Sequence, residues 1–162
     1  MIGTILSDFS RVILDVKDKY YADTLNGLHT ELKDKYGEFD FFKYFEFDEK
    51  LLELYKKLKE KYSLNIFTTG TIQDAPEVKQ RIDGLFENIY TVKDTGLQKS
   101  NPQAYLAIAQ KLHKKPAEIV FIDDQNVNIA AAQDAGLNTI LFTDFASCET
   151  ALQKLGVNGN GR

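Results

Sequence analysis

Four polar segments of this 162-residue chain carry side chains suited to phosphoryl transfer, and each follows an apolar run or its loop. A carboxylate can attack phosphorus and form an aspartyl phosphate, and a second carboxylate can hold Mg²⁺ beside it. A threonine hydroxyl can bind phosphate oxygens, and a lysine can stabilise the group that is transferred. We therefore expect one shared anion site. Its candidate residues are Asp8, Thr68 and Thr69, Lys99, and Asp123 and Asp124.

The elements that must position these residues alternate along the chain. Apolar runs typical of buried strands lie before Asp8 and at 64–67, 88–92, 119–122 and 138–142. Patterns typical of helices lie at 48–61, 75–83, 101–112 and 147–155, and a further one contains 129–135 and stops at Gly136. This alternation predicts an α/β fold, a three-layer α/β/α arrangement with a Rossmann-like parallel sheet. The carboxyl ends of such strands meet along one edge of the sheet, where ligands bind.

Residues 16–46 break the alternation and predict a small helical insertion after the first strand, within a single domain that spans residues 1–162. Residues 18–36 have the apolar spacing of an amphipathic helix. Six of the nine residues from Phe39 to Phe47 are aromatic. We expect most of these rings to pack against the main domain. The alternatives are a substrate-facing surface and a homodimer interface.

Composition and charge exclude several classes of protein. The net charge is −4, and Lys and Arg are mixed with Asp and Glu, so no basic patch predicts nucleic-acid binding. No apolar run approaches the roughly 18 residues of a membrane span, and the N-terminus lacks the pattern of a signal peptide. The single Cys148 excludes an internal disulfide. We expect a cytoplasmic protein that binds neither nucleic acid nor membranes, with His29 facing solvent.

At this point the sequence resembles the haloacid dehalogenase (HAD) superfamily of phosphatases and related hydrolases, over nearly the whole chain except residues 16–46. The segments that carry the resemblance are Ile5-Leu6-Ser7-Asp8-Phe9-Ser10-Arg11-Val12, Ile66-Phe67-Thr68-Thr69, Gly96-Leu97-Gln98-Lys99-Ser100-Asn101-Pro102 and the run from Val120 to Gly136. The last is the most specific, because two aspartates precede an asparagine and an alanine-rich helix that ends in glycine.

The resemblance implies a role for each matching residue. Asp8 would be the nucleophile, Thr68 and Thr69 would bind phosphate, and Lys99 would act on the transferring group. Mg²⁺ would be the cofactor, with Asp124 as its likelier direct ligand beside Asp8. Asp123 would mostly support that site from behind, and the backbone carbonyl of Ser10 would complete the metal contacts.

One departure from the family concerns Ser10. Phosphatases of the family usually carry a second aspartate there, which protonates the leaving oxygen and then activates water. A serine hydroxyl cannot do this unaided, and such a loss costs about 10² to 10⁴ in rate. Arg11 also replaces a small residue and adds a positive charge beside the pocket mouth, where it could bind substrate.

Three functions remain open from the sequence. The favoured one is a phosphatase that is slow or restricted to good leaving groups. The second is binding of a phosphorylated ligand or partner with little turnover, and the third is carbon–halogen hydrolysis, disfavoured because Lys99 and the pair Asp123-Asp124 are retained. A phosphorelay receiver domain is disfavoured because in receiver domains the acidic pair comes first in the chain and the lysine last, whereas here the pair Asp123-Asp124 follows Lys99. The short insertion predicts a partly open site that admits a phosphorylated small molecule or a larger phosphorylated substrate, unless a second subunit covers it.

Overall fold

A parallel sheet forms the centre of the computed structural model, which describes residues 1–159. Its strand order is β5-β4-β1-β6-β7, and every neighbouring pair is parallel. The strands are β1 (Thr4–Ser7), β4 (Ser63–Thr68), β5 (Asn88–Thr91), β6 (Ile119–Asp123) and β7 (Asn138–Leu141). The predicted α/β fold is confirmed, and the strand that leads to Asp8 is the central one.

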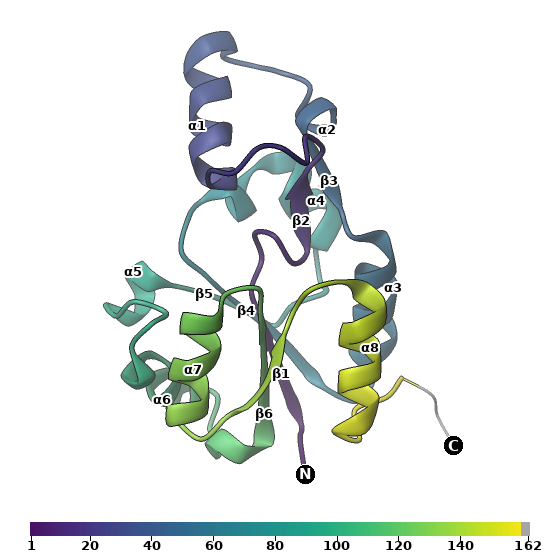
Figure 1. Ribbon diagram of the computed structural model, residues 1–162, viewed down its shortest axis with the longest axis vertical. Coiled ribbons are helices and arrows are strands. Elements are labelled where there is room, and N and C mark those ends of the chain that lie inside the picture. The colour runs from purple at the N-terminus through teal and green to yellow at the C-terminus, as the bar shows by residue number, and fades with distance from the viewer. Residues whose placement is uncertain (160–162) are drawn as a thin grey trace.

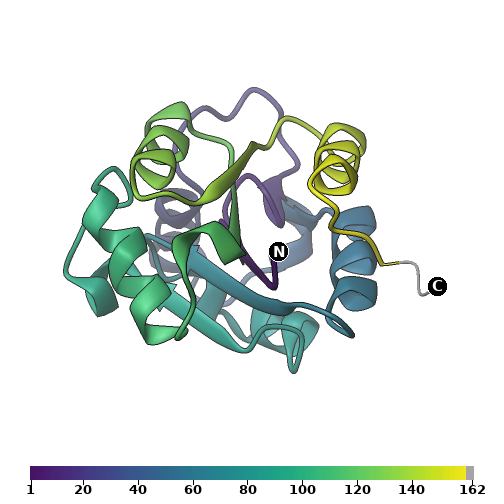
Figure 2. The same cartoon turned by 90° about the horizontal axis from the view of Figure 1, so that it is seen from below.

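Helices cover both faces of the sheet (Figure 1). On one face Ile5 of β1 belongs to a core shared with α3 (Glu49–Leu58), α4 (Pro76–Ile82) and α8 (Phe145–Lys154). On the other face Leu6 packs with α6 (Pro102–Lys111) and α7 (Asn126–Asp134). Figure 2 shows α8, in yellow, beside the blue α3, with α6 and α7 on the opposite side of the molecule. Within residues 1–159 no helix is both long and apolar enough to cross a membrane.

Capping residues in the sequence start several of these helices. The side chains of Asp48, Asn101 and Asp144 each accept a hydrogen bond from a backbone N–H in the first turn of α3, α6 and α8. Pro102 occupies the first turn of α6, where its missing N–H costs nothing. The remaining short elements are η1 (Ile72–Asp74), α5 (Val92–Thr95) and η2 (Pro116–Glu118).

The segment after β1 forms a separate group of elements. It contains α1 (Leu25–Tyr36), α2 (Phe41–Tyr44) and an antiparallel pair of strands, β2 (Leu14–Val16) and β3 (Phe45–Phe47). In Figure 1 this group stands at the top, beyond the carboxyl ends of the central strands. The insertion therefore lies over the edge of the sheet at which the predicted site residues end.

The aromatic residues of the insertion mostly turn inward, as the sequence predicted. Phe41, Phe45 and Phe47 are buried and belong to the core that includes α3 and α8, whereas Phe42 is 45% exposed. The expectation for His29 was wrong: its ring is half-buried and meets the edges of neighbouring aromatic rings at centroid distances of 5.8–6.2 Å. The helix predicted over residues 18–36 was also too long at its N-terminal end. It begins at residue 25 because the Thr24 hydroxyl accepts a hydrogen bond from the Gly27 N–H and caps it.

Candidate active site

The register of the central strands brings the two acidic segments together. Ser7 of β1 lies level with Ile122 of β6, and the Asp8 N–H donates to the Ile122 carbonyl at 2.8 Å. Because both strands run in the same direction, their next residues, Asp8 and Asp123, lie side by side at the carboxyl ends of the two strands. Carboxylate oxygens of Asp8, Asp123 and Asp124 all lie within 4.8 Å of one another. Three buried or half-buried carboxylates at this spacing are the hard oxygen ligands that suit Mg²⁺.

A cavity of about 720 Å³ opens above this cluster. From the sequence-predicted set it is lined by Asp8, Ser10, Arg11, Thr69, Lys99 and Asp124. Thr68 and Asp123 lie just behind it, both almost fully buried, and do not belong to its lining. The structure thus brings together the residues that the four sequence segments contain, although Thr68 is not placed to touch a ligand in the cavity.

Lys99 joins the two strand ends as a buried cation. Its Nζ lies 2.8 Å from Oδ1 of Asp8 and 2.6 Å from Oδ2 of Asp123, and its side chain is only 4% exposed. Burial alone lowers the pKa of Lys99, but the two carboxylates more than offset this, so its pKa is raised above the usual value. A lysine charged throughout the neutral range is therefore fixed beside the predicted nucleophile.

The positive charge of Lys99 is too small to keep all three neighbouring carboxyl groups fully ionised at neutral pH. Burial, opposed by Lys99 and aided by the charge of Asp123, raises the pKa of Asp8 from 3.8 to about 7. Burial and Asp123 likewise raise the pKa of Asp124, whose carboxyl group meets that of Asp8. This excess of negative charge is what a divalent cation would neutralise.

The oxygens of Asp123 are already occupied by the protein. Oδ1 accepts the Gln125 N–H at 2.8 Å, and Oδ2 accepts Nδ2 of Asn128 at 3.1 Å in addition to Lys99. Asp124 has fewer fixed partners and faces the cavity. The arrangement favours Asp8 and Asp124 as direct metal ligands, with Asp123 holding Lys99 and the first turn of α7 in place.

Two tyrosines whose role sequence reasoning missed support the site from below, one behind Asp8 and one behind Lys99. The buried Tyr55 hydroxyl donates to the Ser7 Oγ at 2.8 Å, and the Ser7 Oγ donates to the Asp8 carbonyl at 2.8 Å. Similarly, the Tyr105 hydroxyl donates to the Lys99 carbonyl at 2.6 Å. In the sequence both tyrosines fit the apolar faces of their helices, and no local pattern distinguishes them from ordinary core residues.

Ser10 and Arg11 occupy unusual positions. The Ser10 Oγ is buried and has no hydrogen-bond partner within residues 1–159. Arg11 has a φ of +66°, a left-handed backbone that favours glycine. Its guanidinium binds Oδ1 of Asp15 at 3.0 Å and the carbonyls of Tyr21 and Asp23 at 2.9 and 2.7 Å. Arg11 lines the cavity, but its charge is engaged by the insertion.

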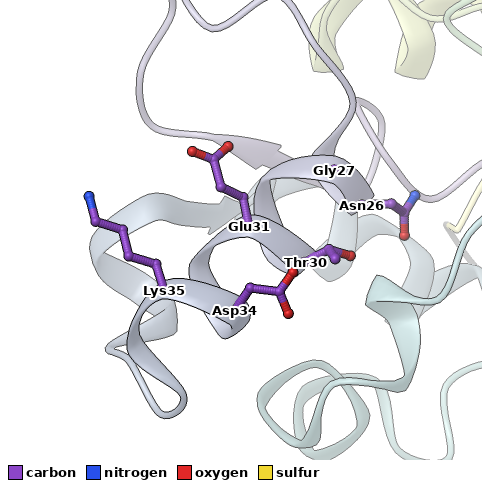
Figure 3. A pocket seen from close by; sticks show the side chains of 6 residues that line it. All are labelled: Asn26, Gly27, Thr30, Glu31, Asp34 and Lys35. Atoms are coloured by element: carbon purple, nitrogen blue, oxygen red, sulfur yellow. The ribbon is translucent and has the colours of Figure 1, made fainter.

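The insertion closes one side of the cavity with residues 22–26, which we call the wall segment. Sequence reasoning assigned no site residue there, because nothing in its composition marks a ligand. A separate shallow hollow runs along α1 and is lined by Asn26, Gly27, Thr30, Glu31, Asp34 and Lys35 (Figure 3). Apart from Asn26 it shares no residue with the cavity, and its exposed charges have mixed sign, so it does not extend the site.

Comparisons with known proteins place the chain in a family. Residues 4–136 match the family model for haloacid dehalogenase-like hydrolases. Bifunctional epoxide hydrolase 2 of Rattus norvegicus is 38% identical over 79 residues, which are 49% of this chain and 14% of that protein. Enolase-phosphatase E1 of Persephonella marina is 32% identical over 97 residues, 54% of this chain and 42% of that protein. The chain thus spans less than half the length of these relatives.

Solved structures share the fold at low identity. A HAD family enzyme of Bacteroides thetaiotaomicron, solved with magnesium and inorganic phosphate, superposes with a TM-score of 0.66 at 18% identity and covers 91% of this chain and 99% of its own. A HAD-like hydrolase of Porphyromonas gingivalis gives 0.66 at 19% identity, covering 96% and 98%. With most of its length matched by the family model, this chain belongs to the haloacid dehalogenase-like hydrolase family.

Proposed function

We propose that the protein is a Mg²⁺-dependent phosphate-ester hydrolase that acts through an aspartyl phosphate on Asp8. The observation that carries this proposal is the position of Asp8, whose Oδ1 is held 2.8 Å from the buried Lys99 Nζ at the floor of the cavity, against the carboxyl group of Asp124. Bound Mg²⁺ would offset the repulsion between the Asp8 carboxylate and the incoming phosphate. Asp8 and Asp124 are the residues best placed to hold it.

The chain's own residues support two chemical steps. In the first, an Asp8 oxygen forms a bond to phosphorus while the bond between phosphorus and the leaving oxygen breaks, and the leaving oxygen takes up a proton from solvent. In the second, water attacks phosphorus and gives up a proton to solvent while the bond between phosphorus and the Asp8 oxygen breaks, which releases inorganic phosphate and regenerates the Asp8 carboxylate. Lys99 stabilises charge on the transferring group in both steps, and Thr69, which lines the cavity just after β4, can bind phosphate oxygens through its hydroxyl.

Ser10 makes proton transfer the weak part of this mechanism. A serine hydroxyl has a pKa far above neutrality and cannot serve as an efficient acid or base unaided. The proposed enzyme is therefore slow, or restricted to leaving groups such as aryl and acyl phosphates that need little protonation. The same feature supports a second candidate function, the binding of a phosphorylated ligand or partner with little turnover.

The cavity also bears on the substrate. Its volume of about 720 Å³ exceeds that of a phosphate group alone, so part of a leaving group fits against the wall segment. A phosphorylated small molecule is the simplest occupant, and a larger phosphorylated substrate would extend through the open side. A homodimer through residues 39–47 stays a prediction, with Phe42 as the most exposed large hydrophobic side chain of that stretch.

A panel of phosphate esters tests the proposed function. The wild-type protein with Mg²⁺ is expected to hydrolyse aryl and acyl phosphates faster than alkyl phosphates, with no turnover after chelation of the metal. The Asp8→Asn variant separates this activity from contaminating phosphatases. Binding of phosphate ligands without turnover in the wild type would select the second candidate function instead.

Mg²⁺ should stabilise the fold more at high pH than at low pH. Because the pKa of Asp8 is raised from 3.8 to about 7, the folded chain binds more protons than the unfolded chain between these values. Without metal, this contribution to the free energy of unfolding is present below pH 3.8 and is lost as the pH rises through about 7. Bound Mg²⁺ requires the deprotonated carboxylate and reverses the penalty.

The expected result is an Mg²⁺-induced rise in Tm that is about 3 °C larger at pH 8 than at pH 6, from roughly one released proton. Thermal unfolding with Mg²⁺ in excess over the dissociation constant of the site measures it. Asp124→Asn, which removes a carboxylate from the cluster, should abolish the shift. Equal shifts at both pH values would show that Asp8 is not a ligand of the ion.

A further inference from the structure

Asn26, in the first turn of α1, contacts the turn that follows β4. Its Oδ1 accepts two hydrogen bonds, from the Thr71 N–H at 2.9 Å and the Ile72 N–H at 2.8 Å. These N–H groups begin η1, just beyond Thr69 and Gly70, which line the cavity. One amide side chain of the insertion thus satisfies two backbone donors of the main domain.

Gly70 is required for this contact. A Cβ built at position 70 would overlap the Cγ, Oδ1 and Nδ2 atoms of Asn26. The side chain of Asn26 therefore lies directly against the backbone of the turn, and any residue other than glycine would displace it. The contact can be broken from either of its two sides.

Asn26 acts together with the preceding residues of the insertion. The guanidinium of Arg11 holds the carbonyls of Tyr21 and Asp23 at the start of the wall segment, and Asn26 holds its end. Residues 22–24 are exposed and belong to no helix or strand, so packing contributes little to their position. Polar contacts at both ends, together with the buried side chain of Leu25, therefore fix the wall segment over the cavity that holds Asp8.

We propose that Asn26 is a positioning residue: by binding the N–H groups of Thr71 and Ile72, it holds the wall segment and the turn of Thr69 in the geometry that receives the substrate. This inference rests on the proposed function for its effect on catalysis. On this proposal the insertion keeps the same position before and after substrate binds, so the cavity is already formed in the free protein. Because the wall segment and the turn contact bound substrate both before and during the reaction, losing the contact weakens binding more than it slows chemistry.

Hydrogen exchange of the Thr71 and Ile72 amides tests the contact directly. In Asn26→Ala and in Gly70→Ala both amides should exchange about tenfold faster than in the wild type, the scale of one net hydrogen bond. Asn26→Asp keeps an acceptor of the same length and should restore slow exchange. Gly70→Ala should add little in the Asn26→Ala background, because the two substitutions break one interaction. Equal exchange in the wild type and Asn26→Ala would overturn the proposal.

Kinetics then separate positioning from a purely structural role. Asn26→Ala and Gly70→Ala should raise KM for an aryl phosphate about tenfold, with kcat within about twofold of the wild type, and Asn26→Asp should restore KM. Thr30→Ala is the matched control, because Thr30 lies one turn farther along the exposed face of α1 (Figure 3). Faster exchange with an unchanged KM would make the contact structural only and overturn the positioning role.

The outcome for Asn26 can be distinguished from the outcome for the proposed function. If the wild type hydrolyses no ester, the proposed hydrolase fails, and the affinity for inorganic phosphate with Mg²⁺ replaces KM as the readout. Affinity about tenfold weaker in Asn26→Ala, restored in Asn26→Asp, would support positioning for a binding protein. Unchanged phosphate affinity would overturn it. Should Asn26→Ala not fold, Gly70→Ala and Asn26→Asp give the same comparison.

Discussion

Asp8→Asn is expected to lower phosphatase activity about 10³-fold or more while leaving the fold intact. Asparagine has the volume of aspartate but cannot form the covalent intermediate. Its Oδ1 can accept the bonds that Asp8 accepts from the Phe9 N–H and the Lys99 Nζ, at 2.7 and 2.8 Å. Its Nδ2 can donate a hydrogen bond to Asp124, whose carboxyl group in the wild type shares a hydrogen bond with that of Asp8. The substitution therefore removes the nucleophile and preserves the hydrogen bonds around it.

Initial rates with an aryl phosphate and Mg²⁺, together with Tm, measure both parts of this expectation. Tm should not fall, because a buried carboxylate with a raised pKa is replaced by a neutral amide. Asp134→Asn, at the exposed end of α7, is the matched control and should keep full activity. Undiminished activity in Asp8→Asn would exclude covalent catalysis at Asp8.

Ser10→Asp is expected to raise the rate of hydrolysis about 10²-fold. A carboxylate at position 10 lines the same cavity and supplies the proton acceptor and donor that the hydroxyl cannot be. The Ser10 Oγ has no hydrogen-bond partner within residues 1–159, so no existing interaction is lost in the exchange. The gain should be larger for alkyl than for aryl phosphates, since the alkyl leaving oxygen needs protonation more.

The ratio of rates with an alkyl and an aryl phosphate measures this difference. Ser10→Asn provides the control, because it has nearly the size of aspartate without its acid–base chemistry, and it should not raise the rate. A carboxylate should also introduce a new limb in the dependence of kcat/KM on pH. Rates unchanged in Ser10→Asp would mean that proton transfer does not limit this protein.

The parallel sheet and most of its helices could be predicted because their signals are local. Asp48, Asn101 and Pro102 mark helix starts within a few residues of sequence, and the apolar strands alternate with them. The proximity of Asp8 and Asp124 could also be predicted. Each aspartate lies at or just after the carboxyl end of an apolar strand, and parallel strands end at the same edge of the sheet.

Other parts of the site could not be predicted because they depend on contacts between distant segments. Tyr55 reaches Ser7 across 48 positions, and Asn26 reaches Thr71 across 45. A buried tyrosine and a surface asparagine carry no local sign of such partners. His29 was placed wrongly for the same reason, since the rings that surround it come from residues 39–45.

Positions 11 and 15 are expected to change together as this sequence diverges. Arginine at position 11 holds a strained left-handed backbone at φ +66°, and its bonds to Asp15 and to two carbonyls of the insertion offset that strain. A glycine there would relax the backbone but release Asp15 and the two carbonyls. Asp15 would then keep only the bond from the Val16 N–H, so selection for an acid at position 15 would weaken. Conversely, loss of Asp15 leaves the arginine with only the two carbonyls to offset the strained backbone, which favours glycine at position 11. Among related sequences, arginine at position 11 and an acid at position 15 should therefore occur together, and their joint appearance would mark when the insertion became bonded to the loop that follows Asp8.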